Sequence, residues 1–324
     1  MNDIITIGSA TRDVFLASKQ FQVIKSSQIP TGVGECVPLG SKVDIDTVVH
    51  TTGGGGTNSA CTFSALGFKT SAITRIGDDD SGKDVLKDLL GYKVKTSLVK
   101  IINKKTTGYS VLLTTSDGER TALVHRGVSG EFKTQDIPLS KLSCKWLYMT
   151  SLGGNLVLAK TIIEHARKKN ALVCFNPGKQ ELQKGLSAFR SILNNLTVLN
   201  LNLEEAQLLA KTSTTNIKEL CKIIARPGLM LIITDGPKGA YAHLDGITWF
   251  VRPQGKKAIS RTGAGDAFGS GVVAGLAKGM GIDEALKIGI LNAESVIQSY
   301  GAKIGIIKTW PTDALKKKIK VTLI

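Results

Sequence analysis

The chain has 324 residues, of which 42% are hydrophobic, and it carries a formal net charge of +16. That length allows one large α/β domain or two smaller ones, and the apolar content is ample for a buried core. No apolar run approaches the roughly 20 residues that a membrane span needs, and the start lacks the basic-then-apolar pattern of a secretory signal. We therefore expect a cytoplasmic protein with no membrane partner.

The positive charge by itself could indicate a nucleic-acid partner. Aromatic residues make up only 5% of the chain, and the lysines are spread along it instead of forming one stripe or tail, which argues against that partner. A basic field also raises the local concentration of phosphorylated small molecules. The five cysteines are scattered and odd in number, so they indicate neither a disulfide framework nor a zinc site.

Strands and helices alternate along the chain. Six apolar stretches read as buried strands, each followed by a helical pattern: 4–7, 71–76, 146–149, 172–175, 197–201 and 230–233. This alternation predicts a parallel sheet with helices on both faces. We see no linker that would divide the chain, so we expect a single domain over residues 1–324.

Two segments break the alternation. Residues 11–49 are rich in Thr, Val, Gly and Ser without a helical period, and residues 107–124 alternate around Asp117-Gly118. An Asp-Gly pair between alternating segments is typical of a β-hairpin turn. A second hairpin is predicted over residues 241–251, around Asp245-Gly246.

A glycine run at residues 53–56 precedes Thr57-Asn58 and a helical stretch over 59–66. Residues 77–83 superficially match the frame of a phosphate-binding P-loop. The next residue is Asp84 instead of Ser or Thr, and three consecutive aspartates would crowd a phosphate, so we reject that interpretation.

The most informative motif is residues 262–267, which place two glycines and a carboxylate at the start of a small-residue helix predicted to begin near Ala264. Free backbone N–H groups at a helix N-terminus attract anionic oxygens, and glycine allows their close approach. Asp266 would repel a phosphate unless it has a function there, such as accepting the proton of an attacking hydroxyl. For the motif alone, a simple N-cap role for Asp266 is the alternative. A dinucleotide fingerprint fits poorly, because Asp266 would lie where a pyrophosphate packs.

In their order, these motifs resemble the ribokinase-like (PfkB) carbohydrate kinase family over nearly the whole chain. The family's N-terminal glycine pair is matched by Gly53-Gly54, and its C-terminal signature, which ends in Gly-Ala-Gly-Asp, is matched by residues 261–266. The resemblance implies a three-layer α/β/α ribokinase-like fold with a mainly parallel sheet. It also implies a small β-sheet lid made by segments of approximately 11–49 and 107–126, and it allows a homodimer through that lid.

The implied activity is ATP-dependent transfer of the γ-phosphoryl group, with Mg²⁺, to a hydroxyl of a sugar or sugar-like substrate. Three residues match family positions that hold the sugar hydroxyls: Asp13, Gly54 and Asn58. Asp266 is the implied base, and the implied anion hole consists of Gly263, Ala264 and Gly265.

On the nucleotide side, Asn202 and Glu205 match the pair that orders magnesium and its waters near the ATP phosphates, with Glu205 acting through water. Asn292 matches a residue beside the nucleotide, and the nucleotide strand-turn is matched by Thr234, Gly236 and Gly239. Each position also has an ordinary structural interpretation. Asp13 could be a turn residue, Asn58 a helix-entry residue, Glu205 a solvated first-turn carboxylate and Asn292 a buried polar helix residue.

The acceptor stays open at this point. Thr11 stands where ribokinase-like sugar sites often carry Asn, which argues against ribose and leaves a nucleoside, fructose, a fructose phosphate or a keto-deoxy sugar acid. The alternatives to a sugar kinase are a nucleoside (adenosine-like) kinase and a non-catalytic sugar or nucleotide sensor on the same fold. The presence of Asp266 argues against the sensor.

The chain departs from the family pattern at Arg261, where many members carry Asp. That Asp lies on a loop whose companion, here near residues 301–305, helps hold a monovalent cation beside the anion hole. A guanidinium in its place would repel potassium and could itself supply the positive charge. We therefore expect activity to be nearly independent of a monovalent cation.

Overall fold

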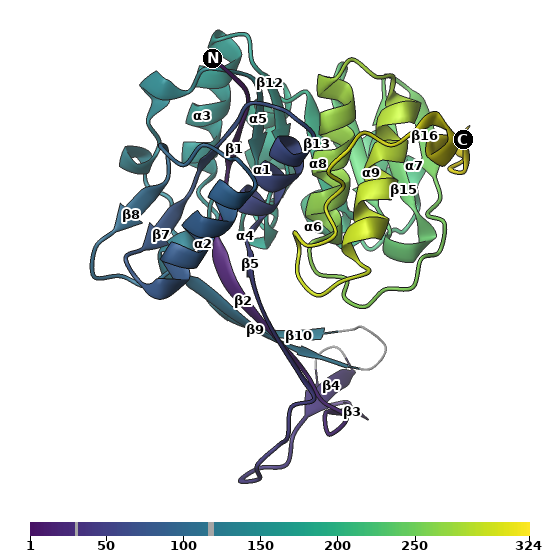
Figure 1. Cartoon of the computed structure of the whole chain (residues 1–324). Helices are drawn as coiled ribbons and strands as arrows, with labels where there is room; N and C mark the ends of the chain where they lie inside the picture. Colours follow the sequence, from purple (N-terminus) through teal and green to yellow (C-terminus); the bar gives the residue numbers. More distant parts are fainter. Residues whose placement is uncertain (30–31, 116–119) are drawn as a thin grey trace.

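A large sheet forms the centre of the molecule (Figure 1), as seen in a computed structural model that describes residues 1–29, 32–115 and 120–324. Its nine strands pair in the order β17-β16-β15-β14-β13-β12-β11-β1-β6. Pairing is parallel from β6 to β14 and antiparallel from β14 to β17. In the order of the sheet, the strands are β17 (Val321–Leu323), β16 (Ile247–Val251), β15 (Ala240–Leu244), β14 (Met230–Thr234), β13 (Val198–Asn202), β12 (Leu172–Phe175), β11 (Cys144–Met149), β1 (Asn2–Ile7) and β6 (Thr70–Ile73).

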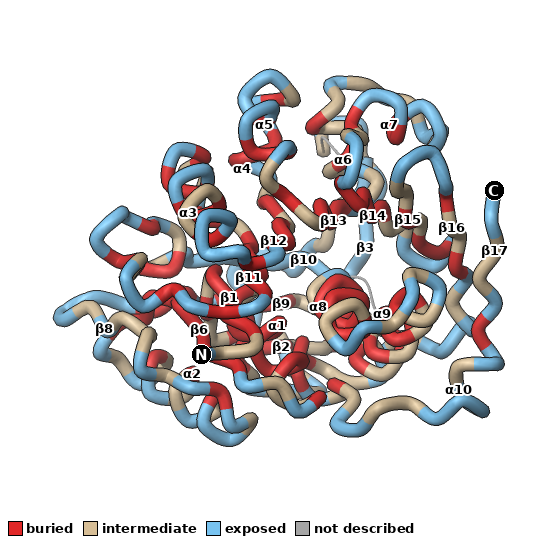
Figure 2. Tube along the Cα trace, turned by 90° about the horizontal axis from the view of Figure 1, so that it is seen from above, coloured by how far each residue is buried: buried red, intermediate tan, exposed pale blue. Residues whose placement is uncertain are grey.

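Helices cover both faces of this sheet, which gives the expected three layers. Figure 2 shows α3, α5, α6 and α7 on one side of the strands and α1, α8 and α9 on the other. The α-helices are α1 (Gly55–Ala65), α2 (Asp80–Gly91), α3 (Leu156–Lys168), α4 (Lys179–Leu182), α5 (Gly185–Leu193), α6 (Leu203–Ala210), α7 (Ile217–Ile224), α8 (Ala264–Ala277), α9 (Ile282–Val296) and α10 (Asp313–Lys317). Short 3-10 turns are η1 (Gly127–Gly130), η2 (Thr134–Asp136), η3 (Leu139–Lys141) and η4 (Gly236–Lys238).

The two largest parts of the core lie on opposite faces of the sheet, because alternate strand residues point to opposite faces. On one face, Ile5 and Ile233 pack with helix residues such as Phe189. On the other face, Ile4 and Ile232 pack with the small-residue helices α1, α8 and α9. Strands buried on both faces explain the nearly continuous Ile, Val and Leu runs in the sequence.

A smaller four-stranded sheet extends from the body (Figure 1), and we call it the lid sheet. Its order is β10 (Arg120–His125), β9 (Gly108–Thr114), β2 (Thr11–Ala17) and β5 (Thr47–Gly53). Two further strand pairs are β3 (Gln22–Lys25) with β4 (Val33–Cys36), and β7 (Arg75–Gly77) with β8 (Lys100–Ile102). The expected β-rich segments thus form the small sheet that the resemblance implied.

Some single strands and hairpins differ from those predicted, and others agree with them. Residues 71–76 are two strands, since β7 leaves the large sheet and pairs with β8. Two of the six expected strands are not followed by an α-helix, since β1 leads into β2 of the lid sheet and β14 leads into η4 and β15. The β9–β10 hairpin is present, while its expected turn at Asp117-Gly118 lies outside the described residues. The β15–β16 hairpin is confirmed, with φ of 46° at Asp245 and 86° at Gly246 as a mirror-image turn requires.

Helix α1 begins at Gly55, earlier than the predicted 59, because Gly55 and Gly56, the last two residues of the glycine run, are helical. A Cβ at Gly56 would lie 2.7 Å from the carbonyl carbon of Gly8 at the end of β1. Thr6 ties the same turn down by donating to the Gly56 carbonyl at 2.9 Å. The helix can therefore approach β1 this closely only with glycine at position 56.

In the part of the chain that the structure describes, no helix combines the length and apolarity needed to cross a membrane.

We predict that Gly56→Ala lowers the free energy of unfolding by about 1–3 kcal/mol, the usual cost of overpacking. Gly91→Ala is the matched control, because a Cβ at this last residue of α2 would meet no described atom within 4 Å. The control should be neutral or stabilising by up to about 1 kcal/mol, from helix propensity alone. Urea unfolding of both variants measures the difference. Equal stability of the two variants would contradict the proposed close approach of α1 to β1.

Candidate active site

The start of α8 is tight on one side and open on the other. Its N-cap, Gly263, has φ of +81°, and a Cβ there would lie 2.3 Å from the Cβ of Ala302. A Cβ at Gly265 would meet no described atom within 4 Å. The backbone between them turns into the helix beside this open space, and the Ala264 N–H itself donates to the Arg261 carbonyl at 3.3 Å. Such a helix start is suited to binding an anion.

Asp266 lies in the first turn of α8, three residues after the N-cap. The simple N-cap interpretation is therefore wrong, since that position belongs to Gly263. The side-chain amide of Asn58, in α1, donates to Asp266 Oδ2 at 2.8 Å. Burial raises the pKa of Asp266, while the hydrogen bond from Asn58 and the positive charge of Lys303 lower it. Asp266 is thus a partly buried carboxylate held at the opening of the helix.

Asp13 approaches the same region from β2 of the lid sheet. It is buried, with 6% of its surface exposed. Burial raises its pKa against the effect of hydrogen bonds from Thr11 and Ser110. Its negative charge in turn raises the pKa of Asp266, so the two carboxylates lie within electrostatic reach of each other. Thus Asp13 belongs to the lid sheet itself and is no isolated turn residue.

Two buried oxygens in this region lack partners. Asp13 Oδ1 and Asn58 Oδ1 have no hydrogen-bond partner among the described residues. A buried acceptor without a donor costs about 1–3 kcal/mol, so such atoms call for an explanation. A ligand rich in hydroxyl donors would satisfy both of them.

Gly54 supports this region through the backbone. It has φ of +94°, and a Cβ there would lie 2.4 Å from the carbonyl oxygen of Ser9. The space that a side chain would enter is therefore occupied by the Ser9–Ala10 backbone. Glycine at position 54 is explained by this packing.

A cavity of about 450 Å³ opens beside the start of α8. Its polar wall follows the carboxyl ends of β13 and β14, where ligands gather in open α/β sheets, while Phe268 and Ile290 add apolar surface. The predicted nucleotide residues that line it are Asn202, Thr234, Gly236 and Gly239, together with Ala264 and Gly265 of the predicted anion hole. The structure thus brings together in one cavity most of the residues expected on the nucleotide side.

Asn202 and Glu205 form a reciprocal cap at the start of α6. Glu205 N donates to Asn202 Oδ1 at 2.8 Å, and Asn202 N donates to Glu205 Oε2 at 2.9 Å. Burial raises the pKa of Glu205, and the charge of Asp266 adds to this effect. Glu205 therefore has a structural role as a capping residue, and it also lies within electrostatic reach of Asp266.

Asn292 does not line the cavity. It is fully buried, and its amide donates to the Ala267 carbonyl at 2.8 Å. Its Oδ1 accepts from Ile307 N at 3.1 Å. Asn292 therefore joins α9 to α8 and to the C-terminal segment, and its expected position beside the nucleotide stays a prediction.

Lys303 is a charged residue of the site that sequence reasoning missed. It is 4% exposed, and its Nζ donates to Thr52 Oγ1 at 2.6 Å and to Asp88 Oδ2 at 3.0 Å. Its positive charge lowers the pKa of both Asp13 and Asp266. A single lysine within the apolar stretch 301–307 was the available signal.

Arg120 was also missed, and it lines the 450 Å³ cavity from β10 of the lid sheet. Its position depends on where the lid sheet lies relative to the body, which no local pattern reveals. Arg261 and Lys256 line the same cavity. The cavity is therefore basic as well as partly apolar, a combination that suits a nucleotide.

The rejected P-loop frame has a clear structural role. Asp79 caps α2 by accepting from Gly82 N at 3.0 Å, and it also accepts from Thr107 N at 2.9 Å. A carboxylate thus occupies the place where a P-loop would hold phosphate. Lys83 is exposed and pairs with Asp80 at 2.8 Å.

Comparison with known proteins agrees with this geometry. Residues 1–309 match the model of the pfkB family carbohydrate kinases. The chain is 28% identical over 251 residues to an uncharacterized sugar kinase of Archaeoglobus fulgidus, covering 75% of this chain and 97% of that protein. It is 28% identical over 272 residues to a cytidine kinase of Thermococcus kodakarensis, covering 80% and 95%.

The fold is that of solved kinases. The adenosine kinase from Sinorhizobium meliloti superposes with a TM-score of 0.77, covering 94% of this chain and 97% of that one. At 19% identity this likeness shows the fold alone. Together with the family match over nearly the whole chain, it leads to one conclusion: the chain belongs to the pfkB family of carbohydrate kinases and is an ATP-dependent phosphotransferase.

Proposed function

We propose that this protein transfers the γ-phosphoryl group of ATP to a hydroxyl of a sugar or sugar-like substrate, with Asp266 as the base. One observation carries the proposal. Asp266 accepts a hydrogen bond from Asn58, whose Oδ1 is a buried acceptor with no partner in the described part of the chain. Asp266 also follows Gly265, which lies on the wall of the nucleotide-sized cavity. A base at that position would stand between an acceptor hydroxyl and a phosphate.

On the acceptor side, hydroxyl groups would donate to Asp13 Oδ1 and Asn58 Oδ1, two buried oxygens that have no partner among the residues that the structure describes. On the phosphate side, the backbone amides of Gly263, Ala264 and Gly265 would stabilise charge on the transferring oxygens. Asp266 would take the hydroxyl proton as the bond to phosphorus forms. Closing the lid sheet over the acceptor would exclude water as a competing nucleophile.

Mg²⁺ fits this arrangement only as a companion of the nucleotide. Among the described residues, no three His, Cys, Asp or Glu side chains gather as a metal site. Mg²⁺ keeps several waters and is commonly held by one or two carboxylates plus substrate phosphates. Glu205, acting through water beside its capping partner Asn202, would supply such a carboxylate. The ion would neutralise phosphate charge.

A nucleoside kinase is the second candidate. The chain is as similar to a cytidine kinase as to a sugar kinase, at 28% identity each. Both acceptors carry a sugar with free hydroxyls, so Asp13 and Asn58 would bind either. We also propose a homodimer through the lid sheet, supported by the exposed apolar residues Leu123 and Val124 on β10.

The acceptor class is tested by thermal unfolding with sugars, sugar phosphates, keto-deoxy sugar acids and nucleosides, each with a non-hydrolysable ATP analogue. A ligand at about 100 times its Kd should stabilise the protein by about 2.7 kcal/mol. ADP release is then measured with every ligand that stabilises. A ligand that binds without ADP release would identify a sensor and contradict the proposed kinase.

We predict that Asp266→Asn lowers kcat by about 10²–10⁴-fold, the usual contribution of a positioned base. Binding of the ATP analogue should remain, because Asn keeps the shape of the side chain. Steady-state ADP release and calorimetric titration of the analogue measure the two effects. Near-full activity of this variant would remove Asp266 from the mechanism.

A second prediction concerns pH and Lys303. Asp266 must be ionised to accept a proton, and the charge of Lys303 lowers its pKa. Lys303→Met removes that effect, so the pKa of Asp266 rises and the acid limb of the kcat–pH profile should move to higher pH. At pH values above the acid limb, kcat of the variant should differ less from that of the wild type than it does on the limb. The control is Lys218→Met, which changes an exposed lysine on α7. Thermal unfolding checks that both variants are folded. An acid limb that stays in place in Lys303→Met would refute the effect.

A third prediction concerns potassium. Arg261 lines the nucleotide-sized cavity, and the ammonium of Lys303 is buried in the neighbouring loop. With two positive charges already present, kcat in Tris chloride should change little when potassium is added. Arg261→Asp should lower activity without sodium and potassium and should create activation by potassium. Strong potassium activation of the unmodified enzyme would show that Arg261 does not replace the ion.

A further inference from the structure

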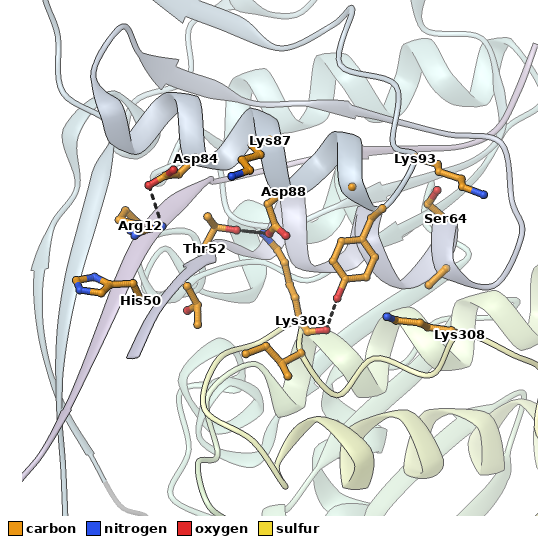
Figure 3. A pocket seen from close by; sticks show the side chains of 15 residues that line it. Arg12, His50, Thr52, Ser64, Asp84, Lys87, Asp88, Lys93, Lys303 and Lys308 are labelled. Atoms are coloured by element: carbon orange, nitrogen blue, oxygen red, sulfur yellow. Dashed lines mark hydrogen bonds and ion pairs between the residues drawn. The ribbon is translucent and has the colours of Figure 1, made fainter. Parts of the chain in front are cut away.

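A second cavity, of about 730 Å³, lies beside the lid strand β5 and shares no lining residue with the nucleotide-sized cavity. Figure 3 shows its walls: side chains from β2 and β5, from α2, and from the C-terminal loop. Its volume falls within the range of small-molecule sites. The lining residues with charged or hydroxyl groups are Arg12, His50, Thr51, Thr52, Ser64, Asp84, Lys87, Asp88, Tyr92, Lys93, Lys303 and Lys308.

The lining is strongly basic. Five Lys or Arg side chains face two Asp side chains, so the walls carry an excess of three positive charges. Both aspartates are already paired, Asp84 with Arg12 at 2.9 Å and Asp88 with Lys303 at 3.0 Å. Lys87 has no carboxylate within ion-pair distance among the described residues. The basic groups therefore exceed what the protein itself neutralises.

Hydroxyl and aromatic groups also line this cavity. Ser64, near the end of α1, adds a hydroxyl to its wall. Lys308 lies with its Nζ 5.9 Å from the ring centroid of Tyr92, so aromatic surface adjoins the basic groups. The wall thus offers cations, a hydroxyl and a ring, which are the groups that bind a phosphate and the organic part attached to it.

We propose that this cavity binds a small phosphorylated molecule. We also propose that its occupancy is transmitted through residues 301–303 to the predicted anion hole at the start of α8. The phosphate would lie among Lys87, Lys303 and Lys308, and it would compete with Asp88 for the Lys303 ammonium.

The path of transmission is a chain of direct contacts. The Tyr92 hydroxyl donates to the backbone carbonyl of Lys303 at 2.7 Å. One residue earlier, Ala302 packs against the N-cap Gly263 so closely that a Cβ at 263 would lie 2.3 Å from the Ala302 Cβ. A shift of Lys303 toward an anion would therefore move the segment that supports the start of α8.

Binding is tested by calorimetry with the nucleotide site saturated by a non-hydrolysable ATP analogue. The probes are inorganic pyrophosphate and fructose 6-phosphate. The double variant Lys87→Ala/Lys308→Ala should bind the preferred probe at least about tenfold more weakly than the wild type, because each removes a charged hydrogen-bond donor. The control is Lys218→Ala/Lys222→Ala on α7, which makes the same charge change at two exposed lysines and should bind like the wild type.

Binding of pyrophosphate alone assigns the cavity to an inorganic anion, and tighter binding of fructose 6-phosphate assigns it to an organic phosphate. Either result supports the site if the cavity variant loses it. No binding to the wild type, or equal binding to both double variants, overturns the proposal.

Transmission is measured as the affinity of the ATP analogue with and without saturating probe. We expect a change of about fivefold or more, within the range of allosteric couplings, in the wild type and the control but not in the cavity variant. An unchanged affinity would overturn the transmission. Because a fructose phosphate is also a candidate acceptor, only an effect that the cavity variant loses and the control variant keeps is assigned to this cavity.

Discussion

The hydrogen bond from Asn58 to Asp266 joins residues that are 208 positions apart in the chain, and the arrangement of the site depends on it. It connects the first turns of α1 and α8, the two helices that begin with glycine-rich turns over the large sheet. Each helix reaches this position because glycine permits close packing, Gly56 against Gly8 and Gly263 against Ala302. With both helix starts fixed by backbone contacts, one short bond is enough to orient the carboxylate.

The balance of charge around Asp266 is a second constraint. Asp13 and Glu205 repel its ionised form, while Lys303 stabilises it. A carboxylate that serves as a base must be buried enough to be reactive and still ionised at working pH. The buried ammonium of Lys303, itself held by Thr52 and Asp88, offsets part of the cost of gathering these acids. Lys303 is thus connected to the lid strand and to the kinase site at once.

The sequence predicted most of the large sheet, since strands buried on both faces leave long apolar runs such as residues 230–233. The sequence also predicted where α8 begins and which polar residues end β13 and β14. Glycine turns and the ends of apolar strands can be recognised from a few neighbouring residues. The sequence was insufficient where position depends on tertiary packing. Asn292 fits either a ligand site or a buried polar role until its partners are known, and Arg120 joins the cavity only through the placement of the lid sheet.

The two unpaired oxygens near Asp266 have a consequence for selectivity. Asp13 Oδ1 and Asn58 Oδ1 are buried on the protein side, so a sugar that lacks one of the matching hydroxyls would leave a desolvated acceptor behind in the complex. Sites of this kind discriminate far more strongly against a missing hydrogen-bonding group than apolar pockets do against a missing methylene. With the proposed acceptor site, a deoxy analogue would therefore be a poorer acceptor than a bulkier sugar that retains every hydroxyl. The selectivity of the kinase would then depend more on the stereochemistry of the acceptor than on its size.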